Sequence, residues 1–138
     1  MILAYIDGGA RGNPGPAGYG VRIEAPDGAV VDELYGALGR ATNNVAEYNG
    51  LLAALQWAID HNERRIHIRA DSELLVKQMR GEYKVRNAGL QPLYVRARLL
   101  AAELDVVKFE HVRREFNKEA DRLSNIGMDE AENRLKTD

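Results

Sequence analysis

Residues 2–7 read Ile-Leu-Ala-Tyr-Ile-Asp, a nearly continuous apolar run that ends on an acid. Such a run is typical of a strand covered on both faces of a sheet, so we expect it to be central. Residues 8–20 are rich in glycine with two prolines and are expected to form a loop. β-like patterning resumes over 19–24 and 29–38, around the turn Pro26-Asp27-Gly28, which predicts an antiparallel meander.

A helical period replaces the β pattern after the meander. Over 44–61, apolar side chains recur at the spacing of a helix that buries one face: Tyr48, Leu52, Leu55 and Ile59. Thr42 or Asn43 is the expected N-cap. The remaining elements expected are a strand at 66–70, helices at 72–80 and 90–104, a strand at 106–112 and a helix from about 118 to 125. This order predicts an α/β fold, a mixed sheet with helices packed on it.

The composition limits both the organisation and the chemistry of the chain. Its 138 residues suit one domain, expected over 1–127, followed by a charged and frayed tail over 128–138. The absence of cysteine excludes disulfides, thiolate metal sites and a cysteine nucleophile, so any metal must be held by oxygen or imidazole. No apolar run approaches the roughly 20 residues of a membrane span, so we expect an unexported, cytoplasmic protein without a membrane partner. The formal net charge of -2 means that affinity for nucleic acid must come from local basic patches.

Four acids stand at positions where a carboxylate is costly or where a site tends to form. Asp7 ends the apolar strand, and an unpaired carboxylate there would lose its hydration. Glu47 shares a helix face with small apolar residues suited to close packing. Asp71 lies where a strand ends and a helix begins, and Asp121 lies in the first turn of the last helix, where the helix dipole favours its ionised form.

Each acid also has an ordinary explanation, and spacing alone does not choose between the two. Asp71 could cap a helix, Asp121 could be a favourable first-turn acid, and Glu47 could pair with a base. Asp7 could accept hydrogen bonds from the adjacent glycine-rich segment. If the four acids meet, they would repel one another unless divalent cations lay between them. All-oxygen ligation would suit hard ions such as Mg²⁺ or Mn²⁺.

Four segments, in order along the chain, resemble the motifs of type 1 ribonucleases H. They are Tyr5-Ile6-Asp7-Gly8 with the loop Arg11–Gly20, Thr42–Glu47, Ala70-Asp71-Ser72, and Asn117–Asp121. The resemblance implies the ribonuclease H-like fold: a five-stranded mixed sheet, an antiparallel meander plus parallel strands, with helices on both faces. It also implies that residues 1–127 form a single catalytic domain.

The resemblance further implies an endonuclease that cuts the RNA strand of RNA/DNA hybrids and leaves 5′-phosphate and 3′-hydroxyl ends. Two Mg²⁺ or Mn²⁺ ions per site would be held by Asp7, Glu47, Asp71 and Asp121, with Asp7 bridging both. Two such ions can activate water and stabilise the leaving oxygen. We expect a monomer without an obligate protein partner.

Substrate contacts are also implied by the resemblance. Three asparagines are expected in the minor groove of the hybrid: Asn13, Asn43 and Asn44. Amides donate and accept hydrogen bonds, which suits the 2′-hydroxyl that marks a strand as RNA. Their ordinary role would be as turn and cap residues. A pocket for a phosphate of the DNA strand is expected from Thr42, Arg86 and Asn87.

The sequence departs from the family pattern in two places. Many family members carry a basic helical insertion after the second helix, whereas residues 81–87 here run directly toward the next helix. Many also carry a histidine in a loop before the last helix, and here that loop is the short segment 113–116. The candidates for its role are Arg114, Glu115 and His111, the last of which reads as part of a strand.

Three other functions are compatible with parts of the pattern. One is a nucleic-acid-binding module of the same fold that has lost activity, although all four acids are present. Another is a superfamily nuclease without hybrid selectivity, such as an exonuclease or a resolvase, against which the asparagine motifs argue. The third is a small-molecule metallohydrolase, supported only by the acids.

Overall fold

A computed structural model of the chain describes residues 1–137, so Asp138, the last residue of the expected tail, lies outside the described residues. The elements are β1 (Ile2–Ala10), β2 (Gly15–Glu24), β3 (Val30–Ala41), α1 (Asn43–Asp60), β4 (Arg65–Ala70), α2 (Glu73–Met79), α3 (Gln91–Ala102), β5 (Val106–His111), the 3₁₀ turn η1 (Arg114–Phe116) and α4 (Lys118–Thr137).

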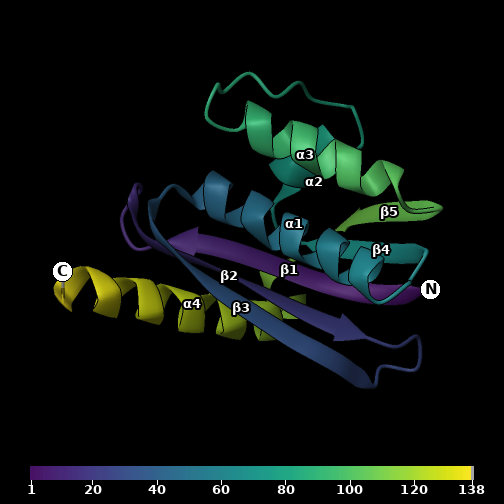
Figure 1. The fold of residues 1–138 in the computed structure, drawn as a ribbon, viewed down its shortest axis with the longest axis horizontal. Helices are drawn as coiled ribbons and strands as arrows, with labels where there is room; N and C mark the ends of the chain where they lie inside the picture. The colour runs from purple at the N-terminus through teal and green to yellow at the C-terminus, as the bar shows by residue number, and fades with distance from the viewer. Residues whose placement is uncertain (138) are drawn as a thin grey trace.

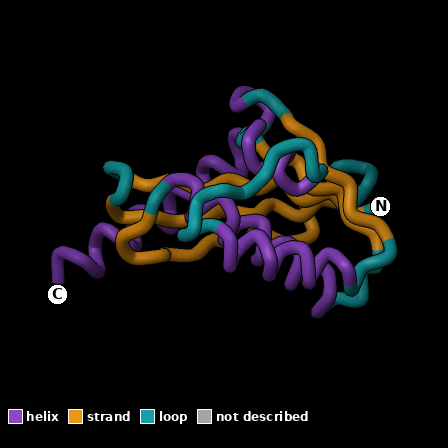
Figure 2. Tube along the Cα trace, turned by 90° about the horizontal axis from the view of Figure 1, so that it is seen from above, coloured by secondary structure: helices purple, strands orange, loops and turns teal. Residues whose placement is uncertain are grey.

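The five strands form one mixed sheet in the order β3-β2-β1-β4-β5. β1 pairs antiparallel with β2 and parallel with β4, which makes it the central strand that the apolar run predicts. The sheet is one twisted layer (orange in Figure 2), with α1, α2 and α3 on one side and α4 on the other (Figure 1). The prediction of a mixed sheet with helices on both faces is therefore confirmed.

The main core lies between the sheet and α1. Alternate residues of β1 point into it, and α1 contributes Tyr48 and Leu55 from its predicted apolar face. Leu52 and Ile59 of the same face are only partly buried and pack at the edge of this core. The buried Tyr48 hydroxyl donates a 2.7 Å hydrogen bond to Gln78 Oε1 and so ties α1 to α2.

The glycine-rich segment 8–20 is mostly strand, so the loop predicted there was wrong. β1 continues to Ala10 and β2 already begins at Gly15. The glycines permit helices to approach the sheet closely: a Cβ on Gly8 would overlap the backbone of Ala46 in α1, and one on Gly20 would overlap the backbone of α4. Gly12, with φ of 90°, serves the turn between β1 and β2, whereas Gly8 and Gly20 serve the close packing of helices on the sheet.

The last helix is longer than predicted, and the expectation of a frayed tail was wrong for residues 128–137. α4 runs to Thr137 instead of ending near Asn125. The reason is a sparse apolar face that continues past that point, because Met128 and Ala131 are 8% and 0% exposed. Arg11 adds ion pairs of 2.6 Å to both Asp129 and Glu132.

The other predicted boundaries agree with the structure to within a few residues. Thr42 is the N-cap of α1, where its hydroxyl accepts the Val45 N–H at 3.2 Å. Between α2 and α3 the described chain contains turns and loop but no helix, so the expected lack of a basic helical insertion is confirmed. None of the helices within residues 1–137 combines the length and the apolar character needed to cross a bilayer.

Candidate active site

The four predicted acids line a single cleft of about 620 Å³, and they come from four separate elements. Asp7 belongs to β1, Glu47 to α1 and Asp121 to α4, whereas Asp71 follows the last residue of β4. The other lining residues are Gly8, Gly9, Asn43, Asn44, Ser72, Arg114, Lys118, Ser124 and Met128. The fold therefore brings together acids that are far apart in the sequence.

Asp7 lies on the face of β1 that α4 covers. It pairs with Gly20, whose missing side chain lets the first turns of α4 approach. Burial, followed by repulsion from Asp71, raises the pKa of Asp7 from an ordinary 3.8 to about 8, although a hydrogen bond from Ser124 opposes the rise. The Ser124 hydroxyl lies 3.1 Å from Asp7 Oδ2 and 2.8 Å from the Asp121 carbonyl oxygen, so its single proton can serve either acceptor.

Glu47 approaches the cleft from the opposite side of the sheet. The close contact of α1 with Gly8 brings it there. Burial raises the pKa of Glu47 to about 7, and repulsion from Asp71 adds to the rise. A hydrogen bond with Ser72 and the positive charge of Arg114 act in the opposite direction.

Asp71 is held in place by a buried side chain from the start of the last helix. Asn117 Nδ2 donates to Asp71 Oδ2 at 3.3 Å and to the Ile6 carbonyl at 2.9 Å. Asn117 is only 1% exposed, and its Oδ1 has no hydrogen-bond partner among the described residues. The same residue accepts the Asp121 N–H at 3.1 Å through its carbonyl. Asn117 thus links two of the four acids to the central strand.

The charged donors of the cleft suit hard divalent ions, because they are carboxylate oxygens and no histidine or cysteine lines the cleft within the described residues. Within residues 1–137, no three acids or histidines are close enough together to form a finished metal cage. The negative charges of Asp71 and Asp121 nevertheless both act on Asp7 and raise its pKa. A cation would relieve the repulsion and desolvation that raise the pKa of Asp7 and of Glu47.

Two of the three predicted substrate asparagines, Asn43 and Asn44, line the cleft, whereas Asn13 does not. Asn43 Oδ1 accepts the Ala10 N–H at 2.8 Å, and Asn13 Oδ1 accepts the Asn43 N–H at 3.0 Å. Because both oxygens bind backbone groups, the Nδ2 groups remain as the donors that each amide can offer. The asparagines therefore also serve the structural role that is ordinary for them.

The expected phosphate pocket is not assembled by contacts in the structure. The Thr42 hydroxyl caps α1, and Asn87 Oδ1 accepts the Gly89 N–H at 2.7 Å in the loop before α3. Neither of them, nor Arg86, is among the residues that line the acidic cleft. The grouping of these three residues stays a prediction.

Comparisons with known proteins agree with this geometry. A family model described as reverse transcriptase-like matches residues 5–127. Ribonuclease H of Methylococcus capsulatus is 32% identical over 145 residues, which cover 94% of this chain and 90% of the relative. The chain belongs to the ribonuclease H family.

Other members of the ribonuclease H family are more similar to the chain. Ribonuclease HI of Halobacterium salinarum is 44% identical over 94% of the chain and 65% of its own length. The N-terminal RNase H domain of Rv2228c from Mycobacterium tuberculosis superposes with a TM-score of 0.93 at 44% identity, over 97% of each chain. The chain spans only 36% of the length of the whole Rv2228c protein. LC11-RNase H1, solved in complex with RNA/DNA hybrid, gives a TM-score of 0.89 at 40% identity, over 95% of this chain and 99% of the other.

The short segment before α4 brings one arginine to the cleft. Of the three candidates from the sequence, Arg114 lines the cleft, and Glu115 lines a separate hollow beside Tyr5 and Phe116. His111 ends β5 and lines neither the cleft nor that hollow. The structure thus places Arg114, and not the other two, beside the acids.

Sequence reasoning assigned no role to three residues around the acids: Asn117 and Lys118, which belong to the motif segment Asn117–Asp121, and Ser124. Lys118 and Ser124 stand three residues before and after Asp121, so helical spacing places them on its face of α4. That spacing was a usable signal. The role of Asn117 was not readable, because its partners Ile6 and Asp71 lie far away in the sequence.

Proposed function

We propose that this chain is an endonuclease that hydrolyses the RNA strand of RNA/DNA hybrids and leaves 5′-phosphate and 3′-hydroxyl ends. The observation that carries the proposal is the meeting of four carboxylates in one cleft with two asparagines on its wall. The complex of LC11-RNase H1 with RNA/DNA hybrid supports this choice of substrate, because that protein shares the fold at 40% identity.

The four acids would hold two Mg²⁺ or Mn²⁺ ions. Asp7 would bridge the two ions, and its side chain interacts with both Asp71 and Asp121. When bound, such ions supply an activated water and stabilise the leaving oxygen of a displacement at phosphorus. The acids themselves do not need to move protons in this role.

Two basic residues give the cleft a positive side. Arg114 and Lys118 both line it, and the charge of Arg114 already acts on Glu47. A guanidinium beside the scissile phosphate can pair with two of its oxygens and so fix its orientation. Arg114 is therefore our candidate for the place of the missing histidine.

Selection of RNA would rest on the asparagines at the other side of the cleft. Asn43 and Asn44 line it, and the amide of Asn43 is held by the Ala10 N–H with its Nδ2 left to donate. A fixed donor suits the 2′-hydroxyl oxygen, the group that distinguishes RNA from DNA at a given position. Asn13, which accepts the Asn43 N–H, supports this arrangement from the adjacent turn.

The formal net charge of -2 and the missing basic insertion predict a modest affinity that weakens strongly as salt is added. Arg86, Asn87 and Thr42 stay candidates for the contact with a phosphate of the DNA strand. We further propose that the catalytic domain is a single unit, and that it acts as a monomer.

The test incubates end-labelled RNA/DNA hybrid, double-stranded RNA and double-stranded DNA with Mg²⁺, with Mn²⁺ and with chelator. We expect cleavage of the hybrid alone, dependent on the metal and abolished by Asp7→Asn. The matched control is Asp105→Asn, which removes an exposed acid paired with Arg64 and should leave the rate unchanged. Equal cleavage of all three duplexes, or cleavage that survives chelation, would contradict the proposal. Hybrid binding without cleavage would instead indicate a binding module.

A further inference from the structure

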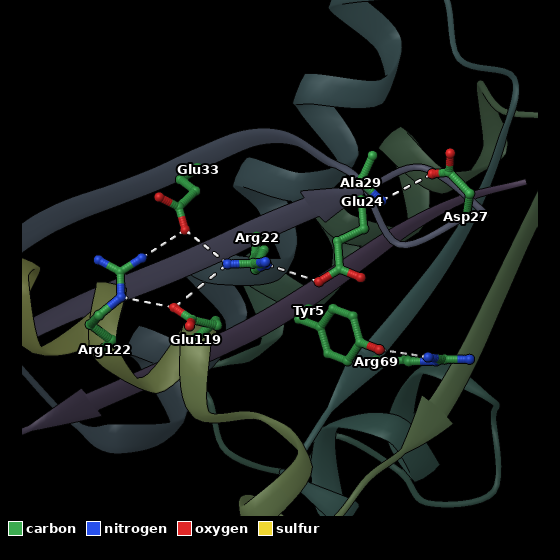
Figure 3. Close-up of polar contacts among 9 residues, drawn as sticks. All are labelled: Tyr5, Arg22, Glu24, Asp27, Ala29, Glu33, Arg69, Glu119 and Arg122. Carbon is green, nitrogen blue, oxygen red and sulfur yellow. Dashed lines mark hydrogen bonds and ion pairs between the residues drawn. The ribbon is translucent and has the colours of Figure 1, made fainter.

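Four charged side chains form a closed ring of ion pairs beside the first turn of α4 (Figure 3). Arg22 Nη1 lies 3.4 Å from Glu33 Oε2 and 3.6 Å from Glu119 Oε2. Arg122 closes the ring, with Nη2 at 2.7 Å from Glu33 Oε2 and Nε at 2.8 Å from Glu119 Oε2. Each acid is thus shared between two arginines, and no two like charges are neighbours in the ring.

The ring joins three elements of the fold. Arg22 in β2 and Glu33 in β3 are directly paired across the antiparallel ladder, and Glu119 and Arg122 project from α4. Arg22 is the least exposed member at 19%, and it also holds Glu24 at 2.8 Å. Isolated surface pairs contribute little, but a closed network with a largely covered arginine holds its members in one geometry.

Beside this ring, glycines of the sheet form part of the contact with α4. Gly18 and Gly20 of β2 face the backbone of α4, where a Cβ on either would overlap it. Helices are usually fixed along their axis by side-chain ridges that fit into grooves, and glycines provide none. The ring contacts the first turn of α4, and this turn places Asp121 beside Asp7.

We propose that the ring of Arg22, Glu33, Arg122 and Glu119 is a positioning device that sets where Asp121 lies relative to Asp7. The inference rests on the proposed function, since it assumes that both acids hold the metal. None of the four residues is among those that line the acidic cleft in the described chain. They act through α4 and not on the substrate, so they are positioning residues.

The experiment exchanges charges within the ring. All variants carry Glu24→Gln, because Glu24 would otherwise repel the acid that Arg22→Glu introduces. The double variant Glu119→Arg with Arg122→Glu keeps the net charge and a pair of opposite charges within the helix. It places like charges at both contacts with the sheet, namely between position 119 and Arg22 and between position 122 and Glu33. Adding Arg22→Glu and Glu33→Arg restores opposite charges at all four contacts, with every sign reversed.

Three quantities are measured for each variant: binding of Mn²⁺ by calorimetry, the melting temperature with and without Mn²⁺, and kcat and KM on hybrid. In the double variant we expect Mn²⁺ binding to weaken by about tenfold and kcat to fall by about tenfold, because small displacements of catalytic groups are costly. KM should stay within about twofold, since no substrate contact is changed. The quadruple variant should recover most of the Mn²⁺ affinity.

A control exchange is available on the same helix. Glu130 and Arg134 form an exposed pair at 3.7 Å, and the variant Glu130→Arg with Arg134→Glu should leave all three quantities unchanged. The proposal is overturned if the double variant binds Mn²⁺ as the background does, or if the quadruple variant recovers its melting temperature but not its Mn²⁺ affinity. Failure of the parent protein to cleave hybrid would refute the proposed function instead, and the Mn²⁺ measurements would still decide the role of the ring.

Discussion

Asn117 donates a hydrogen bond of 3.3 Å to Asp71, and the same amide nitrogen holds the Ile6 carbonyl at 2.9 Å. One buried side chain therefore joins the start of α4, the central strand and an acid of the cleft. We predict that Asn117→Ala lowers the free energy of unfolding by about 1–3 kcal/mol, because it leaves a buried carbonyl without its donor. Cleavage of hybrid should fall at least tenfold, since Asp71 loses its support.

Denaturant unfolding and single-turnover rates check this prediction for Asn117. The informative comparison is Asn117→Asp, which has nearly the same shape but places a negative charge beside Asp71. It should be the more damaging substitution above neutral pH. If both variants cleaved as fast as the parent, Asn117 would be a packing residue only.

The raised pKa values of Asp7, about 8, and Glu47, about 7, predict that the metal-free protein becomes less stable as pH rises. Between the ordinary pKa values near 4 and these higher ones, the folded state holds more protons than the unfolded state. Stability is therefore lost progressively from about pH 4 to pH 8 and changes little above that range.

The free energy of unfolding, measured in the presence of chelator at pH 5.5 and pH 8.5, tests this dependence. Asp7→Asn should flatten most of it and stabilise the protein at the higher pH, because a neutral amide replaces a desolvated charge. Addition of Mg²⁺ should stabilise the parent at pH 8.5 but not the variant. A parent protein whose stability rose with pH in chelator would refute the prediction.

Arg114 lines the cleft and its charge lowers the pKa of Glu47, so its removal should affect catalysis more than folding. We predict that Arg114→Ala lowers kcat by about tenfold or more and leaves the melting temperature within a few degrees. Arg114→Lys should recover only part of the rate, because an ammonium cannot pair with two phosphate oxygens. The control is Arg113→Ala, since that side chain is 76% exposed and contacts Glu115 and the Phe116 ring without lining the cleft.

The close approach of α4 to β2 makes Gly20 intolerant of any side chain. A methyl group there would overlap the Ala120 carbonyl and the Ser124 backbone. We predict that Gly20→Ala lowers the free energy of unfolding by about 3 kcal/mol, at the upper end for overpacking. Gly9→Ala should be mild, because the new carbon meets the flexible end of Met128 and lies at ordinary contact distance from Asn43 Oδ1. Equal stability of the two variants would contradict this view of the interface.

Removal of residues 128–138 should destabilise the protein, because Met128 and Ala131 are buried in α4 and Arg11 pairs with Asp129 and Glu132. We predict a loss of at least about 3 kcal/mol, close to that of deleting a large buried side chain. Melting of the shortened chain tests this. A parent-like melting temperature would restore the idea of a dispensable tail.

Periodicity and order were enough to predict the mixed sheet, its central strand and the main helices. The errors came where one residue type has two physical uses. Glycine permits turns, but at Gly8 and Gly20 it permits a helix to lie against a strand, and the sequence does not distinguish these uses. The end of α4 was missed because Met128 and Ala131 are separated by charged residues, which makes the buried face too sparse to recognise.

The four acids were identified through their motifs, and the structure places them together. The sequence did not reveal which residues support these acids. Asn117 acts on Ile6 and Asp71, and Arg22 acts on Glu33 and Glu119, across separations that only the folded chain closes. The choice among Arg114, Glu115 and His111 likewise required the direction in which η1 leaves β5.

Asp7 lies in the first strand of the fold and Asp121 in its last helix. During synthesis the ribosome releases Asp7 early, but α4 can dock only after its buried residues, as far as Ala131, have left the exit tunnel. A polypeptide on which α4 has not yet docked therefore lacks the acid that this helix contributes. The four acids of the cleft meet only when the first strand and the last helix are both in place.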